Sequence, residues 1–171
     1  MSLKSGFRRL QKHRYGLLVL VSLILVAVSF ITRVVFLLDS GGFQMLSFLT
    51  IVEAFLIGLF FDLANATYFI VPLLIYLWIC PEKVYNKRWH RYILNFLLFL
   101  FTSVLVFNSI SEWFFWEEFT TRFNFIAVDY LVYTTEVIGN IQQSYPIELY
   151  VGAAIVFSAL IVYQFRSWTT Y

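Results

Sequence analysis

The chain has 171 residues, of which 61% are hydrophobic and only 13% are charged. Soluble domains are about 45–50% apolar and about 25% charged, so this composition excludes an ordinary soluble domain and predicts an all-α integral membrane protein. The single cysteine, Cys80, excludes an internal disulfide bond.

The first transmembrane helix is predicted at residues 16–38. It follows a basic cytoplasmic segment, residues 1–15, and carries Arg33 near its far end. A secretory signal peptide has an apolar region of only about 7–15 residues, whereas a spanning helix needs about 20. We therefore expect an uncleaved span rather than a leader peptide.

The next apolar region, residues 46–80, is too long for one spanning helix. Polar side chains recur every three residues from just before this region into its first half, at Gln44, Ser47, Thr50 and Glu53. This spacing predicts a helix at 44–61 with one wet face, which lies in the membrane interface or is re-entrant. We expect a break at 62–65 to divide the region, and the part from 62 to 80 to form the span. The alternative is that 44–61 is an ordinary span whose Glu53 faces neighbouring helices.

Two further spans are predicted at 92–110 and 147–165, and a short cytoplasmic tail, 166–171, follows the second. Pro146 precedes the last span and is a favoured residue in the first turn of a helix. Several tryptophans lie near the ends of the spans, including Trp78 and Trp168. These positions are typical of an interfacial aromatic belt.

The distribution of charge favours four crossings with the N-terminus in the cytoplasm. Cytoplasmic loops are enriched in Lys and Arg, and both the N-terminal segment and the loop 81–91 are basic. The stretch 112–146 instead carries five acidic residues against one base, Arg122. All three segments obey the rule only if 43–80 crosses the membrane once. A chain with five crossings would break the rule twice.

The stretch 112–146 is too aromatic for an ordinary loop. Its apolar side chains recur in steps of three and four at Phe115, Phe119, Phe123, Ile126, Tyr130, Tyr133 and Val137. The pattern predicts one or two amphipathic helices on the outer membrane surface. Glu118 is expected to pair with Arg122 four residues later, and Asp129 falls on the polar face. The stretch is interpreted as a cap that seals the bundle, or as a platform for a lipid headgroup or a docked domain.

Ionisable residues within or beside apolar runs are the candidate site residues, because such groups are costly at membrane depth. Arg33, Glu53 and Asp62 are in this position. We predict that Arg33 pairs with Asp62 or Glu53 near the outer surface. The alternatives are snorkelling to the interface and contact with a lipid headgroup. No phosphate loop, HExxH or CxxC motif is present, so no catalytic, cofactor or metal site is predicted in this chain.

Two segments resemble a known family. RFNFIAVDYLVYTTEVIGNIQQSYP, at 122–146, resembles the segment before the penultimate membrane helix of bacterial lipoteichoic acid synthase-like proteins. These are membrane-anchored, sulfatase-like phosphoglycerol transferases of the alkaline phosphatase superfamily. GLFFDLANATYFIVPLLIYLW, at 58–78, is similar to their Gly-x-x-Phe-Asp-Leu segment with a downstream proline.

The resemblance implies the anchor of an enzyme at the outer face of a bacterial inner membrane. Such an enzyme transfers a phosphoryl group or hydrolyses a sulfate ester, with membrane lipids as partners and an anionic phospholipid as substrate; no nucleic-acid partner is expected. Its catalytic domain holds a threonine nucleophile and a divalent metal such as manganese. We expect that this chain is truncated before that domain and lacks the fifth membrane helix, so no catalytic residue carries over. The alternative is a stand-alone membrane scaffold or transporter subunit.

Overall fold

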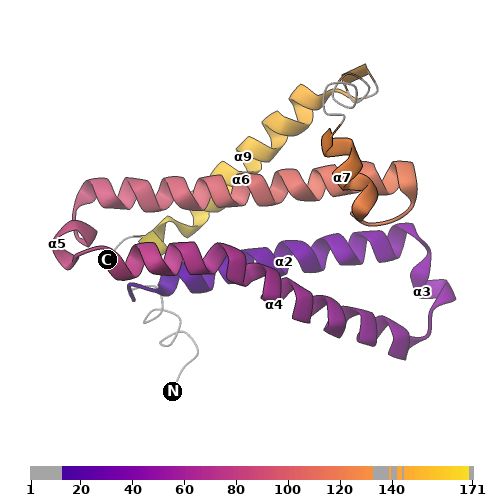
Figure 1. Ribbon diagram of the computed structural model, residues 1–171, viewed down its shortest axis with the longest axis horizontal. Coiled ribbons are helices and arrows are strands. Elements are labelled where there is room, and N and C mark those ends of the chain that lie inside the picture. Colours follow the sequence, from indigo (N-terminus) through magenta and orange to yellow (C-terminus); the bar gives the residue numbers. More distant parts are fainter. Residues whose placement is uncertain (1–12, 133–138, 140–141, 144, 170–171) are drawn as a thin grey trace.

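The computed structural model describes residues 13–132, 139, 142–143 and 145–169, and every regular element in this part is a helix (Figure 1). The long helices are α2 (Gly16–Asp39), α4 (Phe48–Ile79), α6 (Arg88–Phe119) and α9 (Ile147–Phe165). The short ones are α3 (Gly42–Met45), α5 (Glu82–Tyr85), α7 (Phe125–Val132) and the 3-10 helix η1 (Arg166–Thr169). The predicted all-α membrane fold is confirmed, because the four long helices are long and apolar enough to cross a membrane.

Three of the predicted spans correspond to long helices. The span predicted at 16–38 is α2, and the span at 147–165 is α9, with Pro146 as its N-cap. The span at 92–110 lies within α6, which has 32 residues and is about 48 Å long at 1.5 Å per residue. Since the apolar core of a bilayer is about 30 Å thick, α6 extends well beyond it.

The predicted break at 62–65 is wrong, because α4 runs without interruption from Phe48 to Ile79. Ser47 caps this helix by accepting a hydrogen bond from the Thr50 N–H at 3.2 Å. Residues 48–61 are therefore the first half of one helix, neither a separate interfacial helix nor a re-entrant one. A helix of this length fits a bilayer by tilting, and it leaves room for one crossing in this part of the chain.

The long helices alternate in direction, which sorts the charges of the loops to the two ends of the bundle (Figure 1). We call one end the basic end; it holds the first residue of α2 and the loop between α4 and α6, with Lys83, Lys87 and Arg88. The acidic end lies opposite and holds the last residues of α2 and α6, with Asp39, Glu117 and Glu118.

The buried core is concentrated toward the basic end. It is formed by Leu17, Leu20, Val21, Ile24, Leu77, Cys80, Tyr85, Leu94, Leu98 and Trp168. Trp168 is 1% exposed and lies in η1, which packs on α2 and α6. The interpretation of Trp168 as an interfacial anchor is thus wrong, because the segment after α9 folds back onto the bundle. Trp78, by contrast, is 73% exposed, as an interfacial anchor requires.

Candidate functional site

An ion pair joins α2 to α4 within their apolar lengths. The Arg33 Nη2 is 3.0 Å from the Asp62 Oδ2, and each side chain is 13% exposed. The predicted pairing of Arg33 with Asp62 is confirmed, whereas Glu53, the other predicted partner, is exposed. Asp62 comes fourteen residues after Phe48, about 21 Å along the helix. Its partner Arg33 stands six residues before Asp39, the last residue of α2, about 9 Å along that helix.

Gly58 makes room for the Arg33 side chain. A Cβ atom at position 58 would overlap the Cζ, Nε and Nη2 atoms of that guanidinium group. The Arg33 Cζ also lies 5.7 Å from the centre of the Phe55 ring, close enough for a cation–π contact. Phe55, Gly58 and Asp62 follow one another in steps of three and four, so they share one face of α4. We call these three residues the Arg33 socket.

Sequence reasoning missed the role of Gly58, although a signal was present. Glycine within a helix costs about 1 kcal/mol relative to alanine, so a glycine in the middle of a long span indicates a packing requirement. Gly58 also stands one helical turn before Asp62, the ionisable residue of the same helix. The quoted segment GLFFDL thus contains two of the three socket residues.

The socket predicts that Gly58→Ala destabilises the protein when residue 33 is arginine and stabilises it when residue 33 is alanine. In the native chain the new Cβ displaces the guanidinium group from Asp62, which costs about 1 kcal/mol or more after the gain in helix propensity. In an Arg33→Ala background the same change stabilises the helix by up to about 1 kcal/mol. Thermal unfolding of the four proteins in one detergent measures both effects. Equal effects in the two backgrounds would contradict the socket.

A second cluster joins α2 to α6 at the acidic end. The Arg122 Nε lies 2.7 Å from the Glu112 Oε1, and its Nη2 lies 3.3 Å from the Glu112 Oε2. This two-point geometry is the strong form of an arginine–carboxylate pair. The predicted Glu118–Arg122 pair is wrong because α6 ends at Phe119 and Thr120 adopts a left-handed φ of 51°. Residues 118 and 122 therefore do not share a helical face.

Phe36 of α2 is the aromatic centre of this cluster. Its ring is stacked with Trp116 at 4.7 Å and with Trp113 at 6.1 Å between centroids. The Arg122 Cζ is 5.8 Å from the centre of the same ring, and the Trp116 Nε1 donates a hydrogen bond to the Asp39 Oδ2 at 2.8 Å. We call the set the acidic-end cluster: Phe36, Asp39, Glu112, Trp113, Trp116 and Arg122.

The stretch 112–146, predicted as one or two amphipathic surface helices, begins instead with the end of α6. Residues 112–119 continue α6, and α7 is a separate helix of eight residues. Its start is supported by the Asn124 side chain, which accepts a hydrogen bond from the Ile126 N–H at 2.9 Å. α7 exposes Phe125, Val128 and Asp129. The last predicted stripe residues, Tyr133 and Val137, lie outside the described residues.

A third cluster closes the basic end. The Arg14 guanidinium donates to the carbonyl oxygens of Leu77 and Cys80, where α4 ends and its last carbonyls lack helical partners. The Tyr85 hydroxyl donates to the Arg14 carbonyl at 3.1 Å, and the Cys80 Sγ lies 3.5 Å from the buried His90 Nε2. This cluster caps the end of α4 and holds the loop after it against the residues that precede α2, so its role is structural.

In the described part of the chain, no group of three or more His, Cys, Asp or Glu side chains is placed to hold a metal ion. All three clusters connect one helix or loop to another. The arrangement therefore positions helices and presents α7 at the acidic end. Comparisons with protein-family models, with curated proteins and with solved structures found no match.

Proposed function

We propose that this chain anchors an enzyme of the lipoteichoic acid synthase-like family in a bacterial inner membrane, and that its acidic end is the seat of an extracytoplasmic domain. The observation that carries the proposal is the acidic-end cluster. It ties the ends of α2 and α6 to the turn before α7. A domain resting on α7 would thus have a fixed position relative to the membrane.

The charges of the two ends support the orientation. The basic end gathers the Lys and Arg side chains of the loop between α4 and α6, as cytoplasmic loops do. The acidic end then faces outward, which is the side of the membrane on which the resembled enzymes act. The exposed Phe125 and Val128 of α7 offer an apolar surface on that side, next to Asp129.

The chemistry belongs to the enzyme as a whole rather than to this chain. The resembled enzymes transfer a phosphoryl group to or from an anionic lipid or glycan, or hydrolyse a sulfate ester. The role of this chain is to hold such a catalytic domain at the lipid surface, where its substrate is found. The family assignment is supported by the two quoted segments, and one of them supplies Gly58 and Asp62 of the Arg33 socket.

The orientation predicts which engineered cysteines react from outside the cell. In a Cys80→Ser background, Phe125→Cys in α7 should react with a membrane-impermeant maleimide in intact cells. Lys87→Cys, at the basic end, should react only after the cells are permeabilised. Cys80 is the single cysteine of the sequence, so in this background the engineered residue carries the only thiol that can react. The opposite pattern would overturn the orientation.

The genomic sequence beyond the codon for Tyr171 tests the enzyme assignment. A reading frame that continues into another apolar span and a sulfatase-like domain would support it. A stop codon, with no separately encoded sulfatase-like partner that copurifies with the chain, would overturn it.

A second candidate function, a transporter subunit, is favoured by one observation. The Arg33–Asp62 pair lies within the helix bundle, and ionisable pairs at membrane depth often mark substrate or ion pathways. The same genomic observation separates the candidates, because a transporter subunit needs no sulfatase-like domain.

A further inference from the structure

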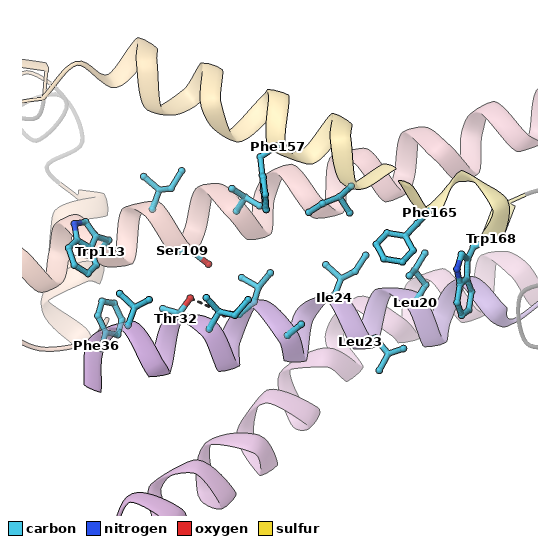
Figure 2. A pocket seen from close by; sticks show the side chains of 17 residues that line it. Leu20, Leu23, Ile24, Thr32, Phe36, Ser109, Trp113, Phe157, Phe165 and Trp168 are labelled. Carbon is cyan, nitrogen blue, oxygen red and sulfur yellow. Dashed lines mark hydrogen bonds between the residues drawn. The ribbon is translucent and has the colours of Figure 1, made fainter. Parts of the chain in front are cut away.

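A long apolar groove runs between α2 and α9, with α6 as its floor (Figure 2). Its volume is about 590 Å³, which falls within the range of about 300–1,000 Å³ that is usual for ligand sites. α2 and α9 both pack on α6, and the space between them stays open. Phe36 and Trp113 stand at the acidic end of the groove, and Phe165 and Trp168 stand at its basic end (Figure 2).

The two hydroxyl side chains that line the groove are already occupied. The Thr32 Oγ1 donates to the Val28 carbonyl at 3.0 Å, and the Ser109 Oγ donates to the Leu105 carbonyl at 3.1 Å. Each hydrogen bond stays within one helix, so neither hydroxyl hydrogen is left to be donated to a ligand. Apolar cavities of this kind do not hold water well. The groove is therefore suited to hydrocarbon.

The width of the groove argues against a further helix as its occupant. The lining of α2 extends from Leu20 to Phe36, about 24 Å along the helix. Even with the space on its open side included, the groove holds about 1390 Å³, which over that length corresponds to a mean cross-section of about 58 Å². An α-helix with side chains is about 10–12 Å across, which requires roughly 80–110 Å². A single extended hydrocarbon chain is much thinner than a helix.

We propose that this groove binds one acyl chain of a membrane phospholipid. The chain lies along α6 between α2 and α9, and it restores the van der Waals contacts that an empty groove would lack. The lipid becomes a bound component of the bundle rather than part of the surrounding bilayer. This inference does not depend on the enzyme family proposed above.

The test uses the full chain in vesicles of phosphatidylglycerol and phosphatidylethanolamine that contain a phospholipid with a photoreactive diazirine in one acyl chain. Mass spectrometry maps the crosslinks. We expect labelling of groove residues such as Ala27 and Ile110 that saturates at low probe content. Labelling of the exposed α4 residues Leu56 and Phe60 should instead rise in proportion to the probe.

Ala27→Phe fills the groove and should lower its labelling about tenfold without changing the labelling of α4. The matched control is Ala54→Phe on α4, an exposed position, which should leave the groove labelling intact. If Ala27→Phe fails to fold, Ile31→Trp tests the same point, because Ile31 lines the groove and is largely exposed. Groove labelling that does not saturate and resists both variants would overturn the proposal, as would crosslinks through the groove to a second copy of the chain.

Discussion

Replacing Asp62 with leucine is expected to destabilise the protein by about 3–5 kcal/mol, because removing one partner of a buried ion pair leaves the other charge uncompensated. Arg33 is enclosed between α2 and α4, and its side chain is 13% exposed. The Arg33 socket offers it no second carboxylate, since Phe55 and Gly58 are its other members. The guanidinium group of Arg33 must then stay buried without a counterion, or α2 must move away from α4 to expose it.

Thermal unfolding of purified protein in a single detergent measures this loss. The double variant Arg33→Met with Asp62→Leu should recover most of the lost stability, because replacing both members of a buried pair by apolar residues is often close to neutral. Glu53→Gln is the matched control on the same helix, since Glu53 is exposed. A double variant no more stable than Asp62→Leu would show that the pair itself is not what the single change removes.

Trp168→Ala is expected to cost about 3–5 kcal/mol, the usual range for removing a buried tryptophan side chain. Trp168 is 1% exposed and belongs to the same core cluster as Leu20 and Leu94. η1 is further held by the Thr169 Oγ1, which donates a hydrogen bond to the Asn95 Oδ1 at 2.7 Å. Loss of the indole ring should therefore release the end of α9 from α2 and α6.

The control for Trp168→Ala is Trp78→Ala, because Trp78 is 73% exposed and faces outward from the bundle. It should change the unfolding temperature little. Limited proteolysis after α9 gives an independent measure, since the released segment becomes a substrate. Equal losses from the two substitutions would mean that Trp168 acts as an interfacial anchor after all.

The long apolar helices in the described part of the chain were largely predictable because hydropathy is a property of contiguous residues. A run of about 20 apolar residues needs a helix in the membrane whatever its neighbours are, so 16–38 and 147–165 were found almost to the residue. The sorting of charges to two ends follows from the same runs and their alternating direction.

The break predicted at 62–65 was wrong because a polar residue in an apolar run is compatible with two different structures. It ends a span when water must solvate it, and it continues the helix when another helix supplies a partner. Only the contact with Arg33, 29 residues away in the sequence, distinguishes these cases for Asp62. The Glu118–Arg122 pair failed for a related reason, because the left-handed turn at Thr120 places Arg122 next to Glu112.

Composition, hydropathy and loop charge are enough to predict an all-helical membrane protein whose loops are basic at one end and acidic at the other. The tertiary structure decided that α4 is one helix, that Gly58 makes room for Arg33, that Trp168 is buried, and that α2 and α9 leave a groove between them. The difference is physical: hydropathy acts along the chain, whereas ion pairs, buried rings and grooves depend on side chains that only the packing of separate helices brings together.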